Sequence, residues 1–142
     1  MHVADAVTLG VDTTVHLDGR VYGKPEDADG AARMLEELAG RTHEVLSGVC
    51  LLGRDFATLG HEVTRVTFRP LAPLELDAYL ASGEWQGRAG AYAIQGLGGR
   101  LVRRIEGDYS NVVGLPAALL VTELERHAPA YLLQAGSTLG QR

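Results

Sequence analysis

Residues 88–116 constrain the fold of this chain more than any other segment, and they read RAGAYAIQGLGGRLVRRIEGDYSNVVGLP. The segment combines a glycine-rich stretch, a strand-like run and the start of a helix. Gln95 is isolated there among small and apolar residues, and a second polar run precedes the helix: Glu106, Asp108, Ser110 and Asn111. A packed core alone does not require polar residues at these places. Because few folds need both patterns, this segment says more about the kind of protein than the composition does.

The length and charge of the chain exclude several classes of protein. A length of 142 residues predicts a single domain, 1–142, that can bury a core without disulfides or a structural metal. A 46% apolar and 22% charged composition is typical of a globular chain. The net charge of −5 argues against a nucleic-acid polymer as partner, because such binding needs a basic surface. A small anionic ligand needs only a few placed cations and N–H groups.

The single cysteine and the absence of long apolar runs predict a cytoplasmic protein with no membrane partner. Cys50 lies in an apolar, strand-like run, and a buried small hydrophobe is favoured there over a nucleophile. A lone thiol fits a reducing compartment. No apolar run reaches transmembrane length, and residues 1–5 do not resemble a signal peptide.

The spacing of apolar residues predicts an α/β domain with a mixed, twisted sheet and flanking helices. Strand patterns cover residues 7–11, 15–17, 20–22, 43–52 and 61–68, and a further strand pattern begins near residue 101. Asp18-Gly19 predicts a tight hairpin turn between the second and third of these strands. Helical patterns cover 26–39, 73–80 and 115–126, and residues 53–60 are predicted to form a loop. The polar, Gly-rich residues 134–142 are predicted to form a frayed tail.

Asp12 is the carboxylate that the sequence singles out for chemistry. It follows an apolar strand run, so we expect it at a strand end, although Asp is disfavoured in strands. One interpretation is a residue that bonds to the local backbone. The other is an oxygen anion that binds a divalent cation or activates a water molecule.

Three further polar residues have two interpretations each. Lys24 lies between Gly23 and Pro25, where a stiff turn can aim its ammonium at phosphate or simply expose it to solvent. The amide of Gln95 can read the edge of a nucleobase or cap a turn. Arg88 can contact phosphate or remain solvated. The histidines show no metal-ligand spacing, and no Walker loop, GxGxxG or GxSxG motif is present.

Taken together, these motifs resemble the Maf family of nucleoside triphosphate pyrophosphatases. The matching segments follow the family order from about residue 6 to about residue 125: 9–15, 18–25, 33–35, 40–45, 89–96 and 105–116. Each segment is weak alone, but the ordered set is specific. The segment around Gln95 is similar to that of the subgroup acting on dTTP and UTP. Val11 departs from the Ala that is usual before Asp12, which is a small change.

The resemblance implies a Maf/inosine-triphosphatase-like fold and a set of residue roles. Asp12 would be the catalytic carboxylate and would lie close to a Mg²⁺ or Mn²⁺ ion. Thr13 and Gln95 would help to select the base, and Lys24 would contact the triphosphate, a role that Arg88 would share. The implied substrates are dTTP, UTP or modified nucleotides, hydrolysed to the monophosphate and pyrophosphate. Family members are cytoplasmic, are often homodimers and are linked to the arrest of septum formation.

The family's opening strand and Ser-x-Ser-Pro-Arg-Arg phosphate loop have no counterpart in the 142 residues. We therefore expect this chain to carry only part of the family's site. Three interpretations stay open: a shortened active pyrophosphatase, a catalytically impaired nucleotide-binding or interaction fragment, and a start codon assigned too late in a longer gene. Upstream DNA with an in-frame Ser-x-Ser-Pro-Arg-Arg segment would support the third, and an in-frame stop would remove it.

Overall fold

The computed structural model describes residues 6–132, so the predicted tail 134–142 lies outside the described residues. Five strands form one sheet in the order β2-β1-β3-β4-β5. Their bounds are β1 (Thr8–Leu17), β2 (Arg20–Tyr22), β3 (Thr42–Leu52), β4 (Ala57–Phe68) and β5 (Val102–Glu106). The α-helices beside the sheet include α1 (Ala28–Leu38), α2 (Pro73–Ser82), α3 (Tyr109–Val113) and α4 (Ala117–His127). Two short 3-10 helices, η2 (Ala89–Ala91) and η3 (Leu97–Leu101), lie between α2 and β5.

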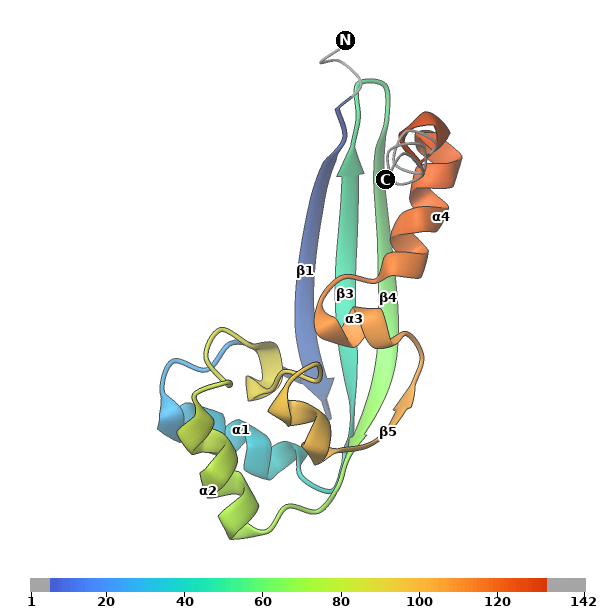
Figure 1. The fold of residues 1–142 in the computed structure, drawn as a ribbon. Helices are drawn as coiled ribbons and strands as arrows, with labels where there is room; N and C mark the ends of the chain where they lie inside the picture. The colour runs from blue at the N-terminus through green and yellow to red at the C-terminus, as the bar shows by residue number, and fades with distance from the viewer. Residues whose placement is uncertain (1–5, 133–142) are drawn as a thin grey trace, which may run out of the picture.

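The α/β class is confirmed, but the prediction of a mixed sheet is wrong. Every strand pair described is antiparallel. Figure 1 shows the reason: α1 and α2 lie at one end of the sheet, so each helical connection returns the chain to the end that it left. A parallel pair would need a crossover along the whole sheet. The Asp18-Gly19 turn is confirmed, with positive φ at both residues.

Two predicted strand boundaries are wrong, and both errors have the same cause. The strands predicted at 7–11 and 15–17 form one continuous strand, β1, which begins at Thr8, because Asp12 and Thr13 pair with Gly48 and Ser47 of β3. The predicted loop 53–60 shrinks to four residues, because β4 begins at Ala57 and pairs with Leu52. In each case pairing with β3 overrides the weak strand preference of Asp and Gly.

The inner face of the sheet carries the core. Alternate residues of β3 from His43 to Leu51 are buried, while the residues between them face the other side. Cys50 belongs to that outer set and is only half-buried, so the prediction that it is buried is wrong. Leu35 and Leu38 of α1 pack on the inner face and are 0% exposed.

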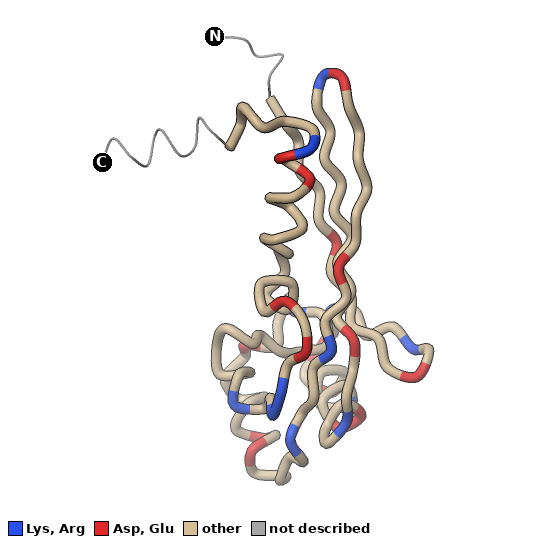
Figure 2. Tube along the Cα trace, turned by 90° about the vertical axis from the view of Figure 1, so that its right-hand side faces the viewer, with Lys and Arg blue, Asp and Glu red and all other residues tan. Residues whose placement is uncertain are grey.

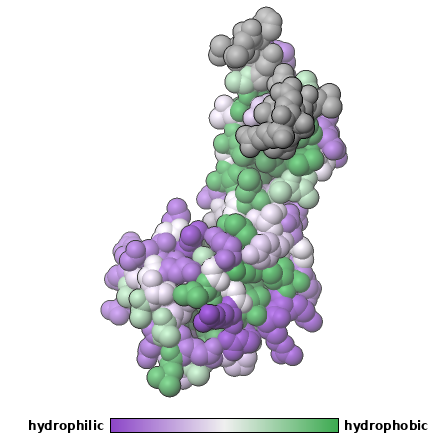
Figure 3. All heavy atoms as spheres, in the orientation of Figure 1, coloured by the Kyte–Doolittle hydropathy of each residue, from purple (hydrophilic) through white to green (hydrophobic). Residues whose placement is uncertain are grey.

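The two ends of the sheet differ. The helical half consists of α1, α2, η2, η3 and the sheet beneath them (Figure 1). The ribbon half consists of residues 8–12, 48–52 and 57–61 together with α4. In the ribbon half α4 covers part of the inner face, where Leu119 lies against Gly60 and Thr58 donates to Glu123 at 2.9 Å. Apolar side chains gather there in Figure 3. None of the helices in residues 6–132 is long and apolar enough to cross a membrane.

Candidate functional site

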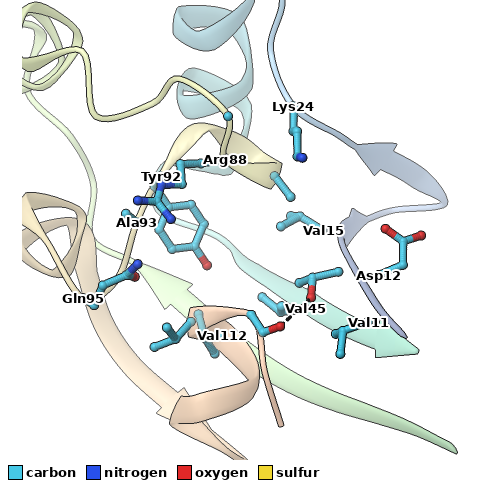
Figure 4. Close-up of a pocket in the computed structure, with 15 residues that line it drawn as sticks. Val11, Asp12, Val15, Lys24, Val45, Arg88, Tyr92, Ala93, Gln95 and Val112 are labelled. Atoms are coloured by element: carbon cyan, nitrogen blue, oxygen red, sulfur yellow. Dashed lines mark hydrogen bonds between the residues drawn. The ribbon is translucent and has the colours of Figure 1, made fainter. Parts of the chain in front are cut away.

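A cavity of about 210 Å³ opens on the inner face where the two halves meet. All five residues singled out from the sequence line it, although they come from four segments of the chain: Asp12, Thr13, Lys24, Arg88 and Gln95. Figure 4 shows Asp12 and Gln95 on opposite sides of this cavity, with Lys24 and Arg88 along its upper margin. The fold therefore brings together residues that are up to 83 positions apart (95 − 12).

Asp12 lies in the middle of β1, so the prediction that it ends a strand is wrong. It pairs with Gly48 of β3, and β2 reaches only the last part of β1, from Val15 to Leu17. The backbone edge of β1 beside Asp12 therefore has no strand partner among residues 6–132. The side chain is exposed, at the rim of the cavity in Figure 4. A solvated carboxylate at a cavity rim can hold a cation or accept a proton from water.

Thr13 faces the inner side, next to Asp12 but on the opposite face of the strand. Its hydroxyl shares a 2.7 Å hydrogen bond with Ser47 and donates to the Gly114 carbonyl at 3.4 Å. Since that carbonyl can only accept, the Ser47 hydroxyl donates to Thr13 in this arrangement. Thr13 thus joins β1, β3 and the turn before α4, and so fixes the wall of the cavity.

The two cations come from neighbouring loops that are joined by backbone contact. Lys24 and Arg88 are both exposed, and the Gly90 N–H donates to the Gly23 carbonyl at 3.1 Å. Gly90 has a φ of +70°, and a Cβ there would lie 2.9 Å from Val15 Cγ2. Glycine is therefore required for the loop carrying Arg88 to lie against β1. Figure 2 shows Lys and Arg interspersed with Asp and Glu along the backbone of the helical half.

Tyr92 forms part of the cavity lining and His43 lies behind it, and neither was singled out from the sequence. Tyr92 lines the cavity, and its hydroxyl lies 2.7 Å from His43 Nε2, with both rings packed edge-on against Phe68. Burial lowers the pKa of His43 to about 4 and raises the pKa of Tyr92, so both are neutral near pH 7. The hydrogen bond to His43 and the packing against Phe68 hold the Tyr92 ring in place. The one signal for this pair in the sequence is a histidine on the buried face of a strand.

Gln95 lies in an exposed turn closed by a hydrogen bond from the Gly96 N–H to the Ala93 carbonyl, 3.1 Å long. The apolar side chains of Val45, Ala93 and Val112 line the cavity near it. An amide beside an apolar wall can bind a flat ring that carries both donors and acceptors.

The donor set fits a cation that arrives with a phosphorylated ligand. No group of three or more His, Cys, Asp or Glu side chains within residues 6–132 could hold a metal ion. Asp12 is the one carboxylate that lines the cavity in this part of the chain. Mg²⁺ is commonly bound through one or two carboxylates together with substrate phosphates and water, which this site can accommodate.

Comparison with known proteins agrees with the sequence motifs. The model of the Maf-like protein family matches residues 2–127. The dTTP/UTP pyrophosphatase of Pyrococcus furiosus is 44% identical over 117 residues, which are 82% of this chain and 62% of that protein. The enzyme of the same name from Moorella thermoacetica is 53% identical over 116 residues, 80% of this chain and 60% of that protein.

A third relative, the dTTP/UTP pyrophosphatase of Syntrophomonas wolfei, is 50% identical over 120 residues, 83% of this chain and 64% of that protein. The chain therefore spans a little over three fifths of the length of the curated relatives it matches. The match extends through β1, which carries Asp12, and the turn that carries Gln95. With a family match over nearly all of its described residues, this chain belongs to the Maf family.

Proposed function

We propose that this chain binds and hydrolyses dTTP and UTP, or modified nucleotides of that kind, to the monophosphate and pyrophosphate. The convergence of Asp12, Lys24, Arg88 and Gln95 on one cavity carries the proposal. The chain's similarity to dTTP/UTP pyrophosphatases supports it. Because the chain spans only part of those relatives, its activity has to be tested on the chain itself.

The base would lie at the Gln95 side of the cavity. Uracil and thymine present one N–H donor between two carbonyl acceptors, and a carboxamide offers the complementary acceptor and donors. Tyr92 and Val112 would flank the ring, and the hydrogen bond between His43 and Tyr92 keeps that wall in place. Thr13 would contribute to base selection through the wall that its hydroxyl fixes.

The phosphates would lie toward Lys24 and Arg88, with Asp12 beyond them. Water would attack the α-phosphorus, the bond from that phosphorus to the α–β bridging oxygen would break, and pyrophosphate would leave. Asp12 would accept the proton of the attacking water. Lys24 and Arg88 would neutralise the charge of the leaving pyrophosphate. Mg²⁺ or Mn²⁺, bound through Asp12 and phosphate oxygens, would supply further charge neutralisation.

The test is release of pyrophosphate from dTTP and UTP with Mg²⁺ or Mn²⁺. Asp12→Asn keeps the size of the side chain but removes its charge, and we expect the rate to fall about 10²- to 10⁴-fold, the usual contribution of a general base. Asp55→Asn, an exposed carboxylate in the β3–β4 turn, is the matched control and should keep the wild-type rate. Equal rates for the wild type and Asp12→Asn would refute the proposed role of Asp12.

A second candidate function is nucleotide binding without turnover. Lys24 and Arg88 are the cations that line the cavity among the described residues, and a triphosphate carries more than two negative charges. Transition-state stabilisation needs more charge neutralisation than ground-state binding does. Calorimetric binding of dTTP, with pyrophosphate release no faster than in Asp12→Asn, would favour this candidate over hydrolysis.

A further inference from the structure

The turn that carries Gln95 is held from behind by a small polar network outside the cavity. The Glu84 carboxylate accepts the Leu97 N–H through Oε2 and the Gly98 N–H through Oε1, each at 2.9 Å. The Tyr79 hydroxyl donates to Glu84 Oε1 at 2.9 Å and accepts the Ala93 N–H at 3.2 Å. The network therefore holds the chain two residues before Gln95 and two residues after it.

The protonation state of this network is defined by its surroundings. Burial alone would raise the pKa of Glu84, but the N–H donors of Leu97 and Gly98 outweigh it and hold that pKa below its usual range. Burial raises the pKa of Tyr79, so Tyr79 stays a hydroxyl donor. An ionised carboxylate thus accepts three hydrogen bonds, and such charge-assisted bonds are stronger than neutral ones.

The turn packs directly against the carboxylate. A Cβ at Gly96 would collide with Glu84 Oε2, and a Cβ at Gly98 would collide with the Ala93 carbonyl. Gly96 therefore lets the backbone approach Glu84, and Gly98 lets the turn close against Ala93. Gln95 itself makes no hydrogen bond to another described residue, so its placement depends on the backbone on either side.

We propose that Glu84 is a positioning residue for base selection: it fixes the turn 93–98 so that the Gln95 amide meets the edge of the pyrimidine ring. This inference rests on the proposed function, because it concerns how the same cavity distinguishes its substrates. A site whose amide is held in place rejects a base with a mismatched donor and acceptor pattern, whereas a mobile amide adapts to it. UTP and CTP form a suitable pair, because they differ only at the edge that Gln95 would read.

The experiment compares the wild type with Glu84→Ala and Glu84→Gln. Amide hydrogen exchange at Leu97 and Gly98 reports on the anchor, and the ratio of kcat/KM for UTP to that for CTP reports on selection. We expect Glu84→Ala to speed hydrogen exchange at both amides. We also expect it to lower the ratio of kcat/KM for UTP to that for CTP about 10-fold, mainly by raising the KM for UTP. Glu84→Gln keeps one carboxamide oxygen as an acceptor and should retain an intermediate ratio.

Glu75→Ala is the matched control, since Glu75 caps α2 and pairs with Arg69 at 2.7 Å, and its hydrogen bonds go to Arg69 and Ala72 and not to the turn. It should lower the melting temperature but leave both the exchange at Leu97 and the UTP to CTP ratio unchanged. Fast exchange in Glu84→Ala with a wild-type ratio would overturn the proposal, as would unchanged exchange. If the wild-type chain neither binds nor hydrolyses UTP, the proposed function fails, and the proposed role of Glu84 in base selection fails with it. Hydrogen exchange at the Leu97 amide still decides whether Glu84 anchors the turn.

Discussion

The helical half and the ribbon half use the same sheet in opposite ways. In the helical half, apolar side chains from two helices close over the inner face, and Leu35 and Leu38 are 0% exposed. In the ribbon half the described residues leave apolar side chains of the outer face exposed, so Leu52 is 47% exposed and Leu59 is 84% exposed. The cavity lies between them, where a rigid core ends and a thin sheet begins.

This contrast explains where polar side chains are found inside the molecule. His43, Ser47, Thr64 and Asn111 are buried near the junction of the halves, and several of them tie separate segments together. The two N–H groups of Asn111 Nδ2 are shared among three acceptors within 3.3 Å: the Val45 and Glu62 carbonyls and Thr64 Oγ1. Buried hydrogen bonds of this kind set a defined geometry where apolar packing is too sparse to do so. The site is thus shaped by polar contacts and stabilised by the apolar core beside it.

The largest expected difference between the halves is in stability. Leu35→Ala in the helical half removes a fully buried side chain and should lower the free energy of unfolding by about 2–5 kcal/mol. Leu59→Ala in the ribbon half removes an exposed side chain and should change it by less than about 0.5 kcal/mol. Urea denaturation measures both. If Leu59→Ala were as destabilising as Leu35→Ala, the outer face of the ribbon would be covered in solution.

A second difference appears on acidification. His43 is 1% exposed and its pKa is lowered to about 4 by burial, whereas the ordinary value is 6.5. The unfolded chain therefore binds a proton at His43 below about pH 6.5 that the folded chain does not bind until about pH 4. Proton uptake at His43 therefore leaves the free energy of unfolding unchanged above pH 6.5. It lowers that free energy by about 3 kcal/mol as the pH drops to 4, at about 1.4 kcal/mol per pH unit.

Unfolding curves at pH 7, 5.5 and 4.5 for His43→Gln and His61→Gln check this prediction. His43→Gln should remove most of the loss of stability in that range. His61 lies exposed on the outer face of the ribbon half, so His61→Gln should keep the wild-type pH dependence. The same pH dependence in His43→Gln and the wild type would show that the histidine beside Tyr92 is not the group responsible.

Local sequence patterns predicted helices and turns well where the element depends only on residues that are close together in the sequence. The Asp18-Gly19 turn is a property of two adjacent residues. The helix α1 has its own signals, since Asp27 accepts the Gly30 N–H at 2.7 Å and Ala31, Leu35 and Leu38 recur on one face. The family resemblance, which depends on ordered motifs along the chain, is also confirmed.

Contacts between distant segments were not predictable in the same way. The strand position of Asp12 is set by pairing with β3, and Tyr92 meets His43 across 49 residues. Glu84 lies 13 residues before Leu97, and a lone glutamate before a tryptophan gives no sign that it accepts backbone N–H groups. The five predicted site residues do line one cavity, but their roles stay predictions.

The smallest expected difference concerns hydrogen bonds in the two halves. The Thr58 hydroxyl donates at 2.9 Å to Glu123, which is 8% exposed, and this bond helps to hold α4 on the ribbon half. Thr58→Val removes a donor to a nearly buried carboxylate and should lower the free energy of unfolding by about 1.5 kcal/mol. Thr67→Val in the helical half breaks only a neutral bond, 2.8 Å long, to Thr42 and should lower it by about 0.5 kcal/mol. Equal losses would mean that the docking of α4 depends on apolar contacts such as Leu119 against Gly60, and not on the Glu123 carboxylate.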